Sequence, residues 1–258
     1  IDGGPRAKAE RLAVEGVRVV QGSVDLAECE FRRFRSDRPL EKLRQVQDEM
    51  VAKISLRKRR RVPKLVGGVD VSYPSPDRGV AAYALVEVES GSLEWSTTIR
   101  RPVRFPYIST YLAFRELPIL LELVEAVRRA GRLSEVVLVD GSGVLHPRRA
   151  GIASHLGVAA SLATVGVTKQ RLCGSVQLEG LGAGESRPVV LEGRSRGIAL
   201  RAPRGSGRPI FVSPGHRADL AFAERLVRHL LLGRRLPEPL YWADRLSRRA
   251  ARGESGRA

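Results

Sequence analysis

The sequence is poor in cysteine, lysine and aromatic residues, and it contains no long uncharged hydrophobic run. Its two cysteines, Cys29 and Cys173, form no CxxC pair. That excludes a disulfide-rich scaffold and a cysteine-based zinc site, and it fits a reducing compartment. No apolar run reaches the roughly 18 residues that a membrane span requires, and the first residues lack an apolar secretory core. We therefore expect a cytoplasmic protein with no membrane association.

Arginine is what the sequence has in excess. The 258 residues carry 45 basic and 28 acidic side chains, a formal net charge of +17, and only six of the basic residues are lysines. Arginine presents a planar fork of donors that fits phosphate oxygens, so the surplus favours nucleic acid as a partner. The alternative is an arginine-rich compositional bias with no partner. An aromatic content of 5% argues against a surface made mainly of stacking platforms for single strands.

The spacing of apolar residues predicts an α/β fold. Three extended segments at residues 65–73, 80–88 and 93–100 have short connections, which indicates an antiparallel meander. A helix over residues 110–130 follows, in which Pro118 predicts a kink or a start nearer Glu116. A strand apolar on both faces comes next, at residues 135–140. Other helices are predicted at residues 40–54, 150–156, 218–232 and 240–250, and other strands at residues 163–168, 189–191, 198–200 and 210–212.

This order of elements is typical of the ribonuclease H-like fold. Its central sheet is mixed, with three antiparallel strands and then parallel strands, and helices flank it. A doubly wound α/β sheet is the main rival. We expect residues 1–38 to form a loosely packed extension, residues 39–250 the main domain, and residues 251–258 a tail.

Two aspartates interrupt or end apolar strands. Asp70 lies inside one, and Asp140 ends another. A buried carboxylate is costly unless it is paired or bound to metal, although Asp140 followed by glycine is also a common turn. If the two strands are neighbours, both carboxylates reach one point, and Glu116 on the intervening helix completes a trio. Such oxygen ligands suit Mg²⁺, which stabilises the attacking and leaving oxygens of phosphodiester hydrolysis.

Three further residues could assist such chemistry. Lys169 follows a strand and is the one lysine after Lys64, which hints at a point charge near phosphate. His216 lies beside backbone N–H groups and an arginine before a helix, and suits a general acid or a phosphate contact. Its alternative is a plain helix-entry loop. Tyr107, beside Pro106, could wedge between bases or pack on the sheet edge.

Taken together, the motifs resemble the endonuclease V family, which acts on deaminated bases. The matching stretches occur in the same order and read VGGVDVSY (66–73), FPYI (105–108) with FRELP (114–118), LVDGSGVLHPRRAGIASHLGV (138–158), TVGVTKQRLCG (164–174), PIFVSPGHRADLAFA (209–223) and LPEPLYWAD (236–244). The resemblance implies Mg²⁺-dependent endonuclease activity, with Mn²⁺ as a substitute. It also implies recognition of deoxyinosine and cleavage of the second phosphodiester bond on its 3′ side, leaving 3′-hydroxyl and 5′-phosphate ends.

The resemblance also assigns roles to individual residues. Asp70 and Asp140 would hold the metal, and Glu116 would position water or a second ion. Lys169 and His216 would line the active site, and Tyr107 would fill the gap left by a flipped base. The remaining nucleic-acid contacts implied by the matching motifs are Pro106, Ile108, Arg115, Gly141 and His146, with backbone groups near Gly141 and Leu145 reading the base.

Two positions depart from the family pattern. The wedge motif usually reads Pro-Tyr-Ile/Val-Pro-Gly, whereas here Ser109 and Thr110 replace the second proline and the glycine. That change should loosen the loop tip. Asp219 stands where the family usually has serine, and it suits a helix N-cap.

The expected partner is double- or single-stranded DNA with deaminated bases, bound by a monomer. Binding should weaken steeply with salt, because arginine contacts to phosphate release counterions. Two alternatives stay open: a ribonuclease acting on inosine in RNA, and a catalytically silent nucleic-acid-binding module.

Overall fold

The computed structural model describes residues 4–14, 16–25, 38–204 and 207–253. The chain divides into two units, one up to Lys42 and one from Leu43 onwards. In the first unit, helix α1 (Gly4–Val14) is followed by a short antiparallel pair of strands, β1 (Val19–Val20) and β2 (Ser23–Val24). Cys29 and most of the second half of the predicted extension lie outside the described residues.

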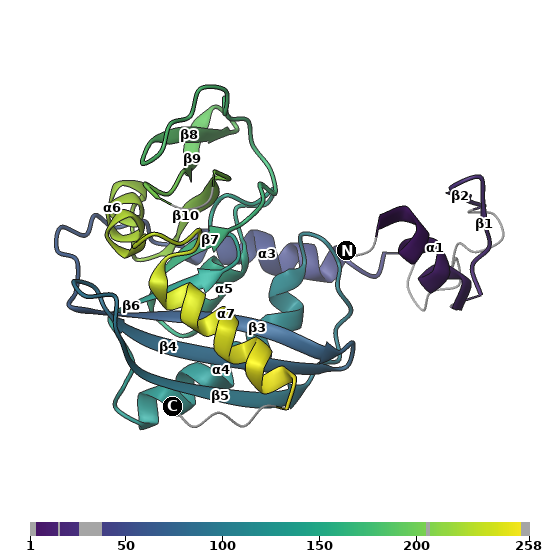
Figure 1. Cartoon of the computed structure of the whole chain (residues 1–258), viewed down its shortest axis with the longest axis horizontal. Helices are drawn as coiled ribbons and strands as arrows, with labels where there is room; N and C mark the ends of the chain where they lie inside the picture. Colours follow the sequence, from purple (N-terminus) through teal and green to yellow (C-terminus); the bar gives the residue numbers. More distant parts are fainter. Residues whose placement is uncertain (1–3, 15, 26–37, 205–206, 254–258) are drawn as a thin grey trace. The chain divides into compact units, whose positions relative to one another are not determined.

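In the second unit, the strands that the structure describes form one sheet in the order β5-β4-β3-β6-β7-β10-β9-β8 (Figure 1). Their bounds are β3 Leu65–Ser75, β4 Arg78–Glu87, β5 Leu93–Pro102, β6 Val136–Asp140, β7 Ala163–Thr168, β8 Ser186–Leu191, β9 Arg194–Leu200 and β10 Ile210–His216. Strands β3, β6 and β7 are parallel, whereas β4 and β5 are antiparallel to their neighbours. This confirms the predicted mixed sheet.

The far edge of the sheet differs from the expectation that parallel strands follow the first three. Strands β8, β9 and β10 are antiparallel to their neighbours. A tight turn joins β8 to β9, in which Glu192 and Gly193 have φ angles of 53° and 70°. Two consecutive positive φ values suit a hairpin turn whose twist matches the strands, so these segments fold back on each other.

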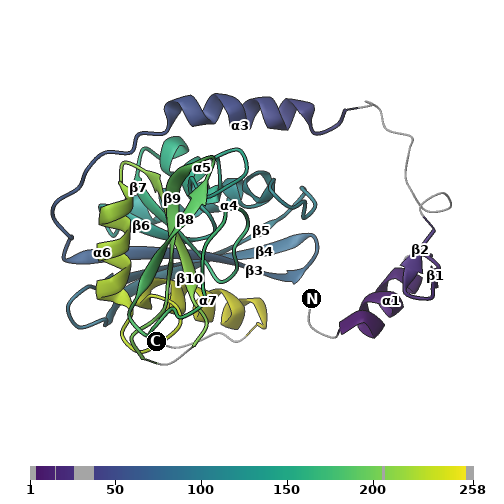
Figure 2. The ribbon, with the colours of Figure 1, turned by 90° about the horizontal axis from the view of Figure 1, so that it is seen from above.

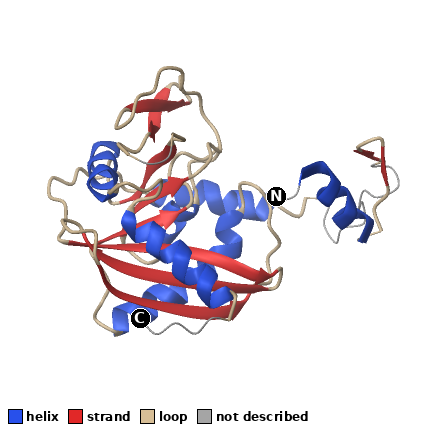
Figure 3. Ribbon diagram, in the orientation of Figure 1, coloured by secondary structure: helices blue, strands red, loops and turns tan. Residues whose placement is uncertain are grey.

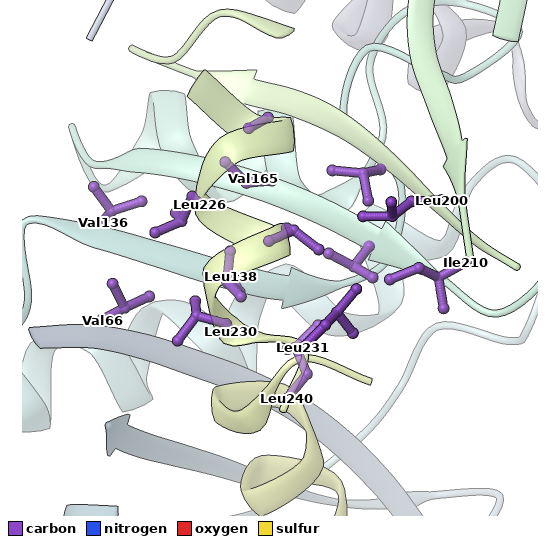
Figure 4. Packing of buried hydrophobic residues seen from close by; sticks show 14 of the residues in the cluster. Val66, Val136, Leu138, Val165, Leu200, Ile210, Leu226, Leu230, Leu231 and Leu240 are labelled. Atoms are coloured by element: carbon purple, nitrogen blue, oxygen red, sulfur yellow. The ribbon is translucent and has the colours of Figure 1, made fainter. Parts of the chain in front are cut away.

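Helices cover both faces of the sheet (Figure 2 and Figure 3). Helices α4 (Leu112–Arg129) and α5 (Ile152–Ala159) pack on one face, and α6 (Leu220–Leu230) and α7 (Glu238–Ala251) on the other. Successive residues of β6 point to opposite faces, so Val137 and Val139 join the first core while Val136 and Leu138 join the second. Figure 4 shows the second core, in which side chains of α6 meet those of β6 and β7. No helix among the described residues is long and apolar enough to cross a membrane.

Two helix starts had been predicted from single residues. Asp219 accepts a hydrogen bond from the backbone N–H of Phe222 at 2.8 Å, so its predicted role as the N-cap of α6 is confirmed. The helix predicted over residues 110–130 is confirmed as α4, which begins at Leu112 and continues through Pro118. Of the two alternatives given for Pro118, a start nearer Glu116 is therefore wrong. The first turn of α4 is held by Phe114, whose ring contacts Phe105, Tyr111 and His155.

Candidate active site

Three carboxylates meet where β3 and β6 come close to α7. Val69 pairs with Val139 across the parallel strands, which brings Asp70 level with Asp140. Asp244 comes from α7, which runs across β3 (Figure 1). One oxygen from each of the three side chains lies within 4.8 Å of the others. The structure therefore brings the two predicted strand aspartates together and adds a third.

Gly68 allows α7 to approach the sheet closely enough for this arrangement. A Cβ at position 68 would lie 2.3 Å from the carbonyl oxygen of Pro239, in the first turn of α7. Any side chain there would therefore push α7, and Asp244 with it, away from β3.

Cations and hydroxyl groups surround the three carboxylates. The Lys169 ammonium lies 3.1 Å from Asp244 Oδ1 and 3.7 Å from Asp140 Oδ2, directly after β7. Arg248, one turn along α7, lies 3.0 Å from the same Asp244 oxygen. The Ser247 hydroxyl donates to Asp70 Oδ2 at 2.5 Å. The structure thus brings Lys169 to the carboxylates, where it bridges two of the three acids.

These contacts do not fully compensate the buried negative charge. Burial is the largest effect on Asp70 and raises its pKa, with Asp244 adding repulsion. Burial likewise raises the pKa of Asp140, and the neighbouring Asp70 carboxylate raises it further. Three carboxylate oxygens that repel one another in a desolvated place form a donor set that fits a divalent cation, because the cation supplies the missing positive charge.

Glu116 lies beside this set but outside the group of three. It is buried in the second turn of α4, and the Tyr73 hydroxyl donates to its Oε1 at 2.9 Å. Burial raises the pKa of Glu116 to about 8, and repulsion from Asp70 and Asp140 contributes. Glu116 is therefore close enough for electrostatic repulsion by both aspartates.

The structure does not bring His216 to the carboxylates. His216 ends β10 and pairs with Thr164 of β7, whereas Asp140 is level with Val167, three residues further along the same strand. Its Nδ1 accepts a hydrogen bond from the Ser55 backbone at 3.1 Å. Three residues of strand correspond to roughly 10 Å, so His216 lies toward the other end of the sheet.

A cavity of about 220 Å³ is lined by residues that are next to the acidic centre in the sequence. Gly141 follows Asp140, and Thr168 and Gln170 flank Lys169; all three line the cavity. Tyr107 lies at its mouth, with 72% of its surface exposed. The geometry therefore places an exposed aromatic ring and a recess next to the acidic centre.

The other predicted contact residues divide into two groups. Pro106 is exposed and Ile108 is half-buried, so both are near the surface of the loop that carries Tyr107. The Arg115 guanidinium donates to the carbonyl oxygens of Phe105 at 2.5 Å and Pro76 at 2.8 Å. It also stacks over Tyr73, 4.2 Å from the ring centre. Arg115 thus anchors the loop.

His146 is buried inside the protein. Its Nε2 lies 3.0 Å from the carbonyl oxygen of Thr110, and its Nδ1 accepts from the backbone N–H of Arg148. Burial lowers the pKa of His146 to about 4, so the ring is neutral near pH 7. The structure brings His146 to the cavity wall as a packed, hydrogen-bonded group.

Asp244 is the site residue that sequence reasoning missed. It stands in the stretch at 236–244, but on an amphipathic helix, where a single carboxylate is typical of a solvated face. The available signal was its spacing, since Ser247 and Arg248 follow at three and four residues on the same helical face.

Comparisons with known proteins agree with this geometry. The family model described as Endonuclease V matches residues 48–245. Endonuclease V of Xylella fastidiosa is 37% identical over 218 residues, which cover 83% of this chain and 89% of that protein. The crystal structure of human endonuclease V is 34% identical with a TM-score of 0.76, covering 84% of this chain and 100% of that one.

A third relative was solved with nucleic acid. Endonuclease V of Ciona intestinalis, in complex with a 24mer DNA containing an inosine followed by a ribo-adenosine, has a TM-score of 0.73 and 27% identity, and the match covers 84% of this chain and 99% of that one. The predicted ribonuclease H-like fold is confirmed by these neighbours. With its matched residues and its acidic centre in place, the chain belongs to the endonuclease V family.

Proposed function

We propose that this protein is a Mg²⁺-dependent DNA repair endonuclease that recognises deaminated bases, chiefly deoxyinosine. It hydrolyses the second phosphodiester bond on the 3′ side of the lesion and leaves 3′-hydroxyl and 5′-phosphate ends. It acts as a monomer in the cytoplasm, and Mn²⁺ replaces Mg²⁺.

One observation carries this proposal: the cavity and the acidic centre share neighbouring residues. Asp140 belongs to the centre while Gly141 lines the cavity, and Lys169 lies between two cavity residues. A base that enters the cavity would therefore hold its own backbone next to the carboxylates. Tyr107, exposed at the mouth, would fill the space that the base leaves in the stack.

Asp70, Asp140 and Asp244 would hold the cation. When bound, a divalent cation supplies the positive charge that stabilises the attacking and leaving oxygens of phosphodiester hydrolysis. Lys169 would add a fixed positive charge beside the scissile phosphate, because its ammonium already lies between Asp140 and Asp244. Glu116, with its raised pKa of about 8, would hold a proton or a water next to the same point.

Inosine in RNA is the second candidate substrate. The Ciona intestinalis relative was solved with DNA in which a ribo-adenosine follows the inosine. An inosine duplex with a ribonucleotide after the inosine is therefore the first substrate to compare with the all-DNA duplex.

The test is a nicking assay with end-labelled oligonucleotides. Duplexes with a single inosine, uracil, abasic site or no lesion, and a matched inosine-containing RNA, are incubated with and without Mg²⁺ or Mn²⁺. We expect a nick in the inosine duplex that requires the metal and is lost in Asp140→Ala. Metal-dependent cleavage retained by Asp140→Ala would contradict the proposal, as would binding without any nicking. Faster cleavage of the RNA would favour the second candidate.

A further inference from the structure

Thr110 has a backbone conformation that its side chain disfavours. Its φ angle is 68°, in the left-handed region. A β-branched residue there is a genuine outlier and persists only where its surroundings hold it in place. The position ends the loop of residues 105–110, which carries Tyr107 and where glycine would adopt this conformation freely.

Three side chains converge on the Thr110 carbonyl oxygen. Gln47 Nε2 donates to it at 2.9 Å and Arg148 Nη2 at 2.9 Å. His146 Nε2 lies at 3.0 Å, and since its Nδ1 accepts from the backbone N–H of Arg148, Nε2 carries the proton and donates. Gln47 is fully buried, and it comes from α3 (Glu41–Lys53), more than sixty residues earlier in the chain.

Arg148 joins these groups into one network. Its Nε donates to Gln47 Oε1 at 2.5 Å, and its Nη2 also donates to Thr110 Oγ1 at 2.7 Å. The guanidinium lies over the Tyr111 ring, 4.4 Å from its centre. The contact with Oγ1 is one that a glycine at position 110 could not make. The Thr110 hydroxyl, on a residue with a strained backbone, therefore gives Arg148 a second atom to bind.

The loop is fixed at both ends while its tip stays exposed. Arg115 binds the carbonyl oxygen of Phe105 at one end, and Arg148 binds Thr110 at the other. Between them, Tyr107 remains 72% exposed. A loop anchored in this way loses less conformational freedom when a ligand orders it.

We propose that Arg148, together with Gln47 and His146, is a positioning residue that clamps Thr110 and thereby sets the place of Tyr107 and of the cavity wall. Thr110 contributes to that wall. The inference rests on the proposed function, because it concerns how the same site selects its base. The same hydrogen bonds account for how Thr110 keeps a left-handed backbone conformation that glycine would adopt unaided.

The test is a cycle of variants at two positions. Hydrogen–deuterium exchange of the peptide covering residues 105–111 is measured in the full-length wild type, Arg148→Ala, Thr110→Gly and the double variant. We expect Arg148→Ala to speed exchange about tenfold in the Thr110 background but about threefold or less in the Thr110→Gly background. A glycine adopts the left-handed conformation unaided, so it depends less on the clamp.

Two further variants keep the experiment informative. Arg149→Ala removes a positive charge from the adjacent residue, whose Nε lies 3.9 Å from Glu192 Oε2. This variant should leave exchange in the loop unchanged. If Arg148→Ala fails to fold, Arg148→Lys replaces it. The lysine keeps the charge but lacks the planar fork that holds Gln47 and Thr110 in one fixed geometry, so it should show the same dependence on position 110 in weaker form.

Nucleic-acid binding gives the second readout. Arg148→Ala should weaken binding to an inosine duplex about fivefold and leave binding to an undamaged duplex unchanged. Equal losses on both duplexes would overturn the proposal, because they would make Arg148 a phosphate contact. The proposal would also be overturned if Arg148→Ala sped exchange equally in the Thr110 and Thr110→Gly proteins. If the wild type does not prefer inosine, the proposed function fails, whereas the exchange cycle still decides whether the clamp exists.

Discussion

The acidic centre and the wedge loop of residues 105–110 are neighbours, but different forces place them. Asp70 and Asp140 are set by the register of β3 and β6, and Asp244 by the close approach of α7 over Gly68. No strand that the structure describes pairs with the loop, which is placed by side-chain hydrogen bonds to the carbonyl oxygens of Thr110 and Phe105. The position of the three carboxylates is thus fixed by backbone geometry, whereas the position of the loop depends on side chains that a substitution can remove.

The largest effect should come from the acidic centre. Asp140→Asn and Asp244→Asn each keep the shape of the side chain and remove one negative charge from the cation site. We expect each to lower single-turnover nicking of an inosine duplex more than about a thousandfold, because the charge held there acts on the reacting phosphate. Binding to the same duplex should remain. A loss of less than about tenfold in Asp244→Asn would remove that residue from the centre.

Changes in the loop should affect binding rather than chemistry. Tyr107→Ala removes a ring that is 72% exposed, so the melting temperature should not change. Affinity for the inosine duplex should fall about tenfold, the value of one aromatic stacking contact, while cleavage at saturating enzyme is retained. Tyr107→Phe keeps the ring and serves as the matched control. If Tyr107→Ala instead slowed cleavage of bound substrate, the division between the two regions would not hold.

Glu116, beside the acidic centre, should make the metal-free protein less stable as pH rises. Glu116 has its pKa raised from 4.5 to about 8 by burial, so the folded state holds a proton that the unfolded chain releases. Stability from this group is therefore present below about pH 4.5 and is lost progressively up to about pH 8. In EDTA, Glu116→Gln should raise the melting temperature by about 5 °C at pH 8.5 and by less at about pH 5.

Mg²⁺ provides the control for that experiment. Cation binding to Asp70, Asp140 and Asp244 should raise the melting temperature more at about pH 8.5 than at about pH 5, because the carboxylates must be deprotonated to bind. If Glu116→Gln instead lowered the melting temperature at the higher pH, the conclusion that folded Glu116 holds a proton would be contradicted.

The smallest effect on cleavage should come from His216. Its ring bonds the Ser55 backbone at the other end of β10, away from the three carboxylates. We expect His216→Ala to lower stability, since the side chain is buried, but to change single-turnover cleavage less than about threefold. A loss of about a hundredfold at unchanged folding would show that His216 acts in the chemistry after all.

Sequence patterns predicted the parts of this molecule whose cause is local. Asp70 and Asp140 stood out because a carboxylate in an apolar strand needs a partner, and Asp219 because a helix start needs a cap. Asp244 did not stand out, because an acidic residue on an amphipathic helix is normally expected to face solvent. Only the packing of α7 against the sheet shows that Asp244 lies beside the other two aspartates.

The rest depends on contacts that no spacing encodes. Gln47 and Arg148 are about a hundred residues apart, yet they meet on one carbonyl oxygen. Loss of the usual glycine at Thr110 predicted a looser loop, whereas the structure shows a hydroxyl and a carbonyl held by Arg148. The reversal of β8 and β9, by contrast, has a local cause, the two-residue turn at Glu192 and Gly193, which the sequence prediction overlooked.

Product mapping shows whether one cation centre cuts the strand next to one recognised base. A duplex with a single labelled inosine strand is incubated with wild type or Asp140→Asn, in Mg²⁺ or in EDTA, and the product length is read on a sequencing gel. We predict one product, cut at the second phosphodiester bond 3′ to the inosine, in Mg²⁺ with the wild type and in no other lane. Cleavage that is independent of the inosine, or that survives EDTA or Asp140→Asn, would contradict the account.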